Sequence, residues 1–153
     1  MISLELRVPP VAVLGLAALA MWLGSRLQPP LDVPSYARAL ATGLVAVAGA
    51  SVAWLGVSAF RRARTTVNPM RPEAATTLVA VGIYRYTRNP MYLGMLLVLI
   101  AWALFLARGL PLLVLPLFVL YMNRYQIVPE ERVLAQRFGA GFAEYQGQVR
   151  RWL

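Results

Sequence analysis

The sequence predicts an all-α integral membrane protein, and three observations support this interpretation. The chain is strongly apolar, with 59% hydrophobic and only 14% charged residues among 153, whereas soluble domains have about 25% charged residues. Its apolar residues form runs close to the roughly 20 residues that a helix needs to cross a bilayer. Every basic residue is arginine and the formal net charge is +9, an excess typical of the cytoplasmic loops of membrane proteins.

Four apolar runs are predicted to cross the membrane as helices. They occupy residues of about 8–27, 39–60, 91–107 and 110–124. The first run follows Arg7 and therefore also resembles a signal peptide, but it ends in Arg-Leu-Gln-Pro-Pro, a poor cleavage site, which favours a retained span. The second run is rich in glycine and alanine, which let membrane helices approach closely. The last two runs, joined by a turn at Gly109, predict a helical hairpin.

The distribution of arginine predicts that both termini are cytoplasmic. Four spans put the termini and the polar segments 65–90 and 125–153 on one side, and the loops there hold twelve of the fifteen arginines. The exceptions are Arg26, Arg38 and Arg108. Because basic loops stay in the cytoplasm, we expect a single domain, 1–153, in the cell (inner) membrane. Helical spacing of apolar residues after residue 125 predicts an amphipathic cytoplasmic cap.

The composition excludes several kinds of functional site. The chain has no cysteine and no histidine, so it offers no thiolate nucleophile, no histidine base and no cysteine-ligated metal, and we expect no metal site. Basic charge in so apolar a chain indicates membrane topology rather than nucleic-acid binding. The expected partners are the lipid bilayer and a lipophilic small molecule, and the sequence leaves the oligomeric state open.

A first polar cluster lies at the start of the third apolar run. Pro90 suits the first turn of that helix, with Asn89 as its N-terminal cap. Arg88, Tyr84 and Tyr92 surround this turn. The free N–H groups at a helix N-terminus attract carboxylates and other anions. The alternative is that the tyrosines and arginines only anchor the helix at the membrane interface.

A second polar cluster follows the fourth apolar run and contains Arg124, Glu130 and Glu131. The glutamates also suit the first turn of a helix after Pro129, where negative charge is favoured. If the last two runs form a hairpin, however, its two cytoplasmic ends are adjacent, and this cluster meets the one around Asn89. The sequence therefore predicts a polar pocket that opens to the cytosol and the bilayer.

The two clusters carry a two-part motif. The motif reads Gly82-x-Tyr84-x-x-x-Arg88-Asn89-Pro90-x-Tyr92-x-Gly94, then Glu130-Glu131-x-x-Leu134-x-x-x-Phe138-Gly139-x-x-Phe142-x-x-Tyr145. Over residues of roughly 65–152 the chain resembles the isoprenylcysteine carboxyl methyltransferase family, which also includes phospholipid methyltransferase-like membrane enzymes. The family usually has histidine where this chain has Asn89, a side chain that forms hydrogen bonds but does not titrate.

The resemblance implies that S-adenosylmethionine binds at the cytoplasmic face and leaves as S-adenosylhomocysteine. The residues expected to bind this cofactor are Val81, Gly82, Tyr84, Asn89, Pro90, Tyr92, Leu93, Gly94, Glu130 and Glu131. The two glutamates are expected to accept hydrogen bonds from the ribose hydroxyls or the ammonium group. Arg124 is expected to hold an anionic acceptor group, because its planar fork matches a carboxylate. Arg88 shares that task or pairs with a glutamate.

These expectations lead to one favoured function and two alternatives. The favoured function is methylation of a lipophilic acceptor, with a carboxylate such as a prenylcysteine-type or isoprenoid acid preferred because it needs no deprotonation. The first alternative is a non-catalytic membrane scaffold or binding subunit that keeps the methyltransferase fold. A small transporter is the weaker alternative, since no charge interrupts the apolar runs at mid-bilayer.

Overall fold

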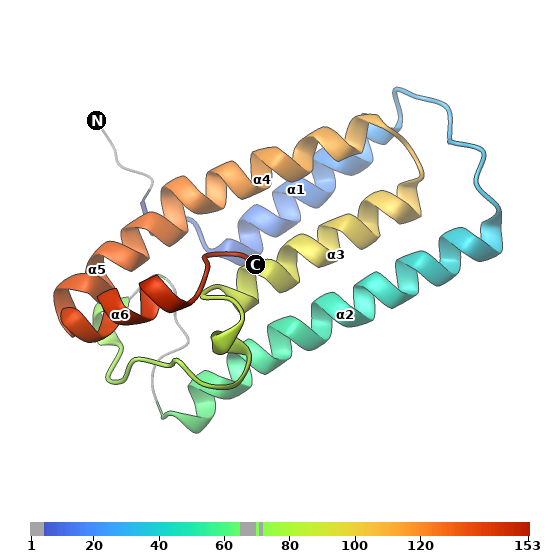
Figure 1. Ribbon diagram of the computed structural model, residues 1–153. Coiled ribbons are helices and arrows are strands. Elements are labelled where there is room, and N and C mark those ends of the chain that lie inside the picture. The colour runs from blue at the N-terminus through green and yellow to red at the C-terminus, as the bar shows by residue number, and fades with distance from the viewer. Residues whose placement is uncertain (1–4, 65–69, 71) are drawn as a thin grey trace.

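The computed structural model describes residues 5–64, 70 and 72–153, and all regular structure in these residues is helical, as predicted. The longer helices are α1 (Pro10–Ser25), α2 (Ser35–Arg62), α3 (Pro90–Leu106), α4 (Val114–Met122), α5 (Val128–Phe138) and α6 (Ala140–Gln148) (Figure 1). The short elements are the 3₁₀ turns η1 (Pro72–Ala74), η2 (Gly82–Arg85) and η3 (Leu110–Leu113) and the π-helical turn η4 (Asn123–Ile127).

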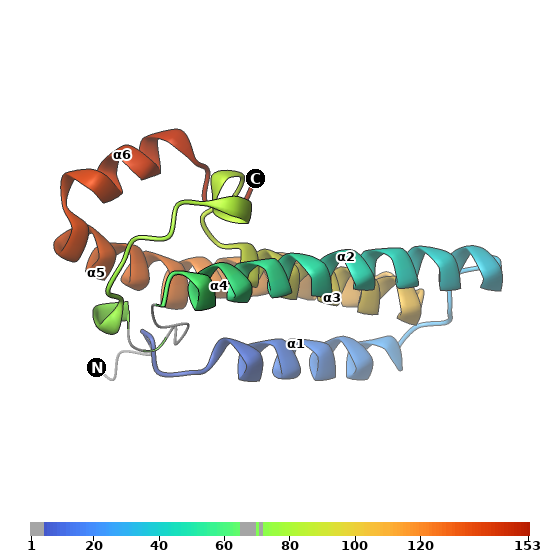
Figure 2. The same ribbon diagram turned by 90° about the horizontal axis from the view of Figure 1, so that it is seen from below.

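Helices α2, α3 and α4 form one layer of a bundle, with α1 on one side of it and α6 on the other side at one end (Figure 2). The closest approach joins α2 to α3. A Cβ atom added to Gly94 would lie 2.7 Å from the carbonyl oxygen of Gly49 and 2.7 Å from the Cβ of Ala53. Of the small residues in the second apolar run, Gly49 and Ala53 serve this packing. Gly43 and Ala50, which were also expected on the packing face, are exposed.

The predicted hairpin is present, and its second arm is longer than expected. After α3 the backbone of Ala107 is left-handed, with φ 48°. The chain then turns through η3, where Leu110 N donates a hydrogen bond to Gln28 Oε1 at 2.8 Å. From there one helical segment, Leu110–Phe138, runs through α4, η4 and α5. Its apolar part ends before α5, whose first turn contains Glu130 and Glu131.

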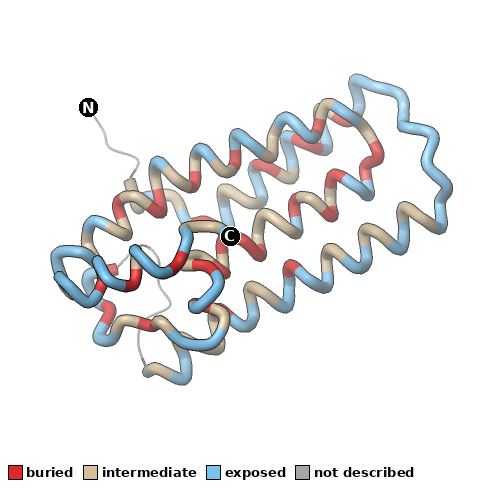
Figure 3. The backbone as a smooth tube through the Cα atoms, viewed as in Figure 1, coloured by how far each residue is buried: buried red, intermediate tan, exposed pale blue. Residues whose placement is uncertain are grey.

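Two helical segments are long and apolar enough to cross a membrane. They are Ser35–Arg62 and Leu110–Phe138. Most of α2 is exposed or only half-buried (Figure 3), including the large apolar side chains of Leu44 and Trp54, which suits contact with lipid. Helices α1 and α3 are apolar but have only 16 and 17 residues. The arrangement of four spans and the cytoplasmic position of the cap therefore stay predictions.

The apolar core consists of two clusters. The first lies inside the bundle, where Met21, Leu99 and Met122 are completely buried. The second lies at one end of the bundle, where Tyr84 packs with Phe142 and other residues of the segment after α5. Because this second cluster fixes the segment between η1 and α3 against α6, it shapes the region in which the two predicted polar clusters meet.

Candidate active site

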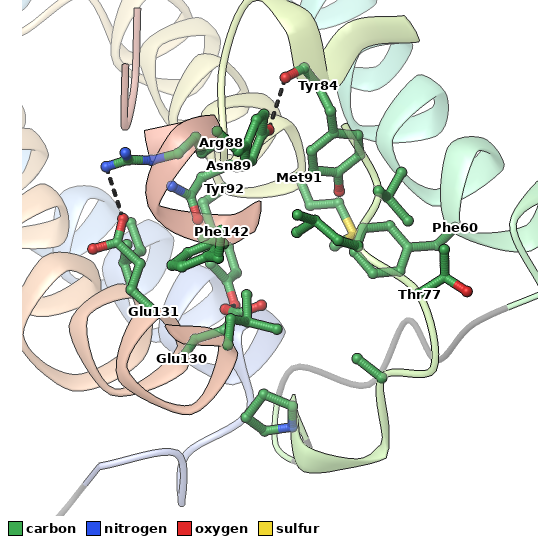
Figure 4. Close-up of a pocket in the computed structure, with 17 residues that line it drawn as sticks. Phe60, Thr77, Tyr84, Arg88, Asn89, Met91, Tyr92, Glu130, Glu131 and Phe142 are labelled. Carbon is green, nitrogen blue, oxygen red and sulfur yellow. Dashed lines mark hydrogen bonds and ion pairs between the residues drawn. The ribbon is translucent and has the colours of Figure 1, made fainter. Parts of the chain in front are cut away.

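A pocket lies between the N-terminal end of α3, the C-terminal end of α2, and helices α5 and α6 (Figure 4). The space between its lining atoms is about 800 Å³, including its open mouth. Six predicted site residues line it: Tyr84, Arg88, Asn89, Tyr92, Glu130 and Glu131. The structure thus brings the first polar cluster and the two glutamates of the second together at the base of the hairpin.

The N-terminal end of α3 positions Asn89 and Tyr92. Pro90 occupies the first turn, as predicted, and Leu93 N donates to the carbonyl oxygen of Asn89 at 2.9 Å. The Asn89 side chain does not cap this helix. Its Nδ2 donates instead to the carbonyl oxygen of Arg151 at 2.9 Å. Asn89 therefore connects the start of α3 to the segment that follows α6.

Glu131 is held by two arginines. Its Oε1 lies 2.9 Å from Arg88 Nη2, and its Oε2 lies 2.7 Å from Arg151 Nη2. Arg151 Nε adds a third hydrogen bond, to Oε1 at 3.2 Å, while Arg88 Nη1 donates to the carbonyl oxygen of Gln146 at 3.1 Å. Both oxygens of Glu131 thus already have partners, and this carboxylate fixes the Arg88 guanidinium against α6.

Glu130 has a different environment from its neighbour. Its Oε2 accepts a hydrogen bond from the Tyr92 hydroxyl at 3.0 Å. Burial raises the pKa of Glu130 to about 7, against the lowering effect of the Tyr92 hydrogen bond, and the nearby Glu131 charge adds to the increase. A carboxyl group that titrates near neutrality inside a pocket is a common feature of functional sites.

Two tyrosines connect α6 to the segment before α3. The Tyr145 hydroxyl donates to the carbonyl oxygen of Tyr84 at 2.7 Å. Burial raises the pKa of Tyr145 to about 12, although the Arg88 charge acts in the opposite direction. Burial is also the main cause that raises the pKa of Tyr84. Both phenols are therefore neutral hydrogen-bonding groups at physiological pH.

Five residues that the motif assigned to the cofactor lie outside the pocket. Val81 and Gly82 are exposed at the start of η2, where Gly82 has φ 62°. Leu93 and Gly94 are buried in α3, and Gly94 packs against α2. Pro90 is buried close to Gly56 of α2. At these positions the structure shows backbone conformation and helix packing, and the expected contacts with the cofactor stay predictions.

Arg124 also lies outside the pocket, and its expected role of binding the acceptor stays a prediction. Its side chain is 61% exposed and pairs with Glu5 at 2.6 Å. The Arg124 hydrogen bond lowers the pKa of the Glu5 carboxyl group. Arg124 belongs to the π-helical turn η4, which changes the direction of successive side chains. Gln126 and Ile127 are buried, and Arg124 points to the N-terminal segment.

Sequence reasoning missed the role of several pocket residues. Arg151 was counted only for topology, because nothing in the local pattern indicates a contact with Glu131. Phe142 and Tyr145 were part of the motif but were given no role, although both line the pocket. The predicted polar segment 65–90 also contributes lining residues, among them Thr77 and Val79. Positions 65–69 and 71 of that segment lie outside the described residues.

The fold and pocket together define an all-helical protein with membrane-compatible helices and a carboxylate-containing pocket at one end of the bundle. The family model for phospholipid methyltransferases matches residues 36–141, about two thirds of the chain. The chain therefore belongs to the phospholipid methyltransferase family, within the isoprenylcysteine carboxyl methyltransferase-like group of membrane methyltransferases. This confirms the resemblance that the motif indicated.

One curated relative is similar to part of the chain. It is an uncharacterized protein of Haemophilus influenzae, 44% identical over 63 residues, which are 41% of this chain and 100% of the relative. No solved structure matches the chain. The family assignment therefore depends on the family model, and the residues that perform the chemistry must be argued from the pocket.

Proposed function

We propose that this protein uses S-adenosylmethionine to methylate a lipophilic acceptor at the cytoplasmic face of the membrane. Its family implies membrane methyltransferase activity. The observation that carries the proposal further is the pocket in which Glu130 and the Arg88–Glu131 pair lie among aromatic side chains, next to apolar helices.

The residues of the pocket suit this cofactor. One carboxylate oxygen of Glu130 accepts a hydrogen bond from the Tyr92 hydroxyl. The other oxygen can accept a hydrogen bond from an ammonium or a ribose hydroxyl group. Among the described residues, the buried Nε of Arg88 has no hydrogen-bond partner, and a buried donor of this kind favours an anionic ligand group. Phe60 and Phe142 provide apolar walls. The pocket therefore offers partners for the cationic, anionic and apolar parts of the cofactor.

The bound cofactor would supply an electrophilic methyl group on a sulfonium. The protein's part is to align the acceptor with that group and to exclude water, since alignment alone contributes several kcal/mol or more. Glu130 and Arg88 orient the amino-acid part, and Tyr92 fixes the Glu130 carboxyl. Glu131 acts as a positioning residue, because its two arginine contacts hold Arg88 in place.

The apolar half of the pocket supports a lipophilic acceptor. Met91, Leu134 and Ile127 line it, and α2 and α3 continue from it as apolar helices. A carboxylate acceptor is still preferred because it needs no deprotonation, although Arg124, which was expected to hold its anionic group, does not line the pocket. The assay should therefore compare carboxylate, amine and thiol acceptors that carry the same apolar chain.

The scaffold alternative has one observation in its favour. The Arg151 guanidinium pairs with Glu131, and the Arg151 carbonyl oxygen accepts a hydrogen bond from the Asn89 amide. Polar groups that already have partners within the chain would suit a pocket that never binds a ligand. Calorimetric titration of the detergent-purified protein with S-adenosylmethionine separates the two functions. We expect saturable binding that weakens about ten- to a hundredfold in Glu130→Gln, since a hydrogen bond to a charged group contributes about 1.5–3 kcal/mol.

The matched control is Glu144→Gln, which removes an exposed glutamate of α6 whose described partner is Gln148. It should bind the cofactor like the wild type. Membranes that contain the protein should then transfer a labelled methyl group to a lipid-soluble product. Absence of binding at millimolar cofactor would contradict the proposal and favour the scaffold.

A further inference from the structure

A second cavity lies at the opposite end of the bundle. This distal groove is lined by the first turns of α2, the last turns of α3 and the covering segment that joins α1 to α2. These segments lie at the end of the bundle away from α6 (Figure 1). It encloses about 760 Å³, including the part open to the surroundings. The 17 residues of α3 separate it from the candidate active site by about 25 Å, at 1.5 Å per residue. A ligand headgroup in the groove therefore makes no contact with Glu130.

Small side chains leave the distal groove open. Ala37 and Ala41 contribute to it from α2, and Ala103 and Ala107 from the end of α3. The covering segment is fixed to α3 by a hydrogen bond from Leu31 N to the carbonyl oxygen of Ala107 at 2.7 Å. The groove thus has an apolar wall, and a hydrogen bond holds the covering segment in place over it.

The open side of the groove faces the surface that suits lipid. The lining residues Leu104 and Leu112 are exposed, and both belong to the apolar hairpin. The covering segment adds Leu31 and Val33, which are exposed as well. An acyl chain in the groove would pack against this apolar surface through van der Waals contacts, because surrounding lipid tails leave no hydrophobic driving force.

Two arginines are the charged residues among those that line the groove, Arg38 from α2 and Arg108 from the turn after α3. Arg108 Nε donates to the carbonyl oxygen of Gln28 at 2.8 Å, which leaves its two Nη groups for a ligand. No ion pair is found for either arginine in the described part of the chain. A guanidinium group matches a phosphate oxygen pair in geometry and charge.

We propose that the distal groove binds an anionic membrane phospholipid, with one acyl chain along the apolar wall and the headgroup phosphate between Arg38 and Arg108. The arginines lie at the helix ends, at the depth where lipid phosphates lie if α2 and the hairpin cross the membrane. An anionic lipid is favoured over a zwitterionic one because its headgroup has no ammonium to repel the two guanidinium groups. This site is independent of methyl transfer and does not depend on the proposed function.

Native mass spectrometry of the whole chain in mild detergent tests the proposal. The probes are phosphatidylglycerol and phosphatidylcholine with identical acyl chains at equal concentration. We expect phosphatidylglycerol to bind in preference, and Arg38→Gln to weaken its binding about fivefold, the effect of one basic residue at an anionic lipid surface. Arg108→Gln should have a similar effect. Phosphatidylcholine binding should change little in either variant.

Arg26→Gln is the matched control. Arg26 lies at the same end of the bundle but outside the groove, with its guanidinium 4.7 Å from the centre of the Trp22 ring. It should bind both lipids like the wild type. A second variant, Ala41→Phe, fills the groove without changing charge and should lower the binding of both lipids.

Three results would overturn the proposal. The first is that the wild type binds the two lipids equally. The second is that Arg26→Gln weakens phosphatidylglycerol binding as much as Arg38→Gln does. The third is that Ala41→Phe, with a wild-type melting temperature, binds both lipids like the wild type. A wild-type dimer that Ala41→Phe dissociates, without any effect of phosphatidylglycerol, would assign the groove to a second copy of the chain instead.

Discussion

Replacement of Glu131 by glutamine tests whether this carboxylate holds the candidate active site together. The change keeps the size of the side chain and removes the charge that Arg88 and Arg151 share. Glutamine can accept only one of these hydrogen bonds well, and its amide group repels the second arginine. We therefore expect Glu131→Gln to lower the free energy of unfolding and to loosen Arg88.

The magnitude follows from the exposure of the three side chains. Glu131 and Arg88 are 14% and 12% exposed, close to a buried pair, for which loss of one partner costs about 3–5 kcal/mol. Arg151 is 36% exposed, and an ion pair at such a position contributes about 0–1 kcal/mol. Because glutamine retains one hydrogen bond, we expect a loss of about 2–4 kcal/mol.

The assay is denaturant titration of the detergent-solubilised protein, followed by tryptophan fluorescence. A double-mutant cycle with Arg151→Gln should give a small coupling energy, and a cycle with Arg88→Gln should give a large one. Glu144→Gln is the control and should stay within about 0.5 kcal/mol of the wild type. If Glu131→Gln is as stable as this control, the two arginine contacts do not fix the site and the reasoning is refuted.

Four further predictions concern the pocket, the helix packing and the topology. The affinity for the cationic cofactor should rise from about pH 6 to about pH 8. The reason is that Glu130, with its pKa raised to about 7, is neutral in acid and binds a cation only as a carboxylate. In calorimetry, Glu130→Gln should abolish this dependence of the affinity on pH. Gly94→Ala should lower the melting temperature, at a cost of about 1–3 kcal/mol, since its Cβ would lie 2.7 Å from α2 atoms; wild-type stability would mean that α2 and α3 pack less closely. Arg124→Lys should leave the single-turnover methylation rate within about twofold of the wild type, because this side chain pairs with Glu5. A strong decrease would instead support its expected role in binding the acceptor. Cysteines at Ser35 and at Thr66, which lies outside the described residues, should be labelled from opposite sides of sealed vesicles, and labelling from one side would contradict the predicted topology.

The sequence predicted the helices and the meeting of the polar clusters for reasons that are local. Apolar runs, small residues and a turn at Gly109 are enough to predict a hairpin, and a hairpin with short connections brings its two ends together. The pairs of Arg88 with Glu131 and of Tyr92 with Glu130 then follow from their positions directly beyond these ends.

The remaining differences arise from features that local patterns do not contain. The π-helical turn adds a residue to one helical turn, and this changes the direction of Arg124 although its distance along the chain is as expected. Gly94 of the motif lies where α2 and α3 touch, a contact that the motif itself does not indicate. The contact of Arg151 with Glu131 joins segments whose spacing has no helical or strand period, so only the folded chain shows it.

The connection between the start of α3 and the segment after α6 has a consequence for the order of folding. Arg88 N donates to the carbonyl oxygen of Arg150 at 3.0 Å, and Asn89 donates to the carbonyl oxygen of Arg151, 62 residues further along the chain. At about 5–20 residues per second, a ribosome needs roughly 3–12 s to add these residues. During that interval, water or lipid headgroups must satisfy the polar groups at the start of α3. The hairpin can therefore be inserted in the membrane before the pocket exists, and the pocket is the last part of the molecule to assemble.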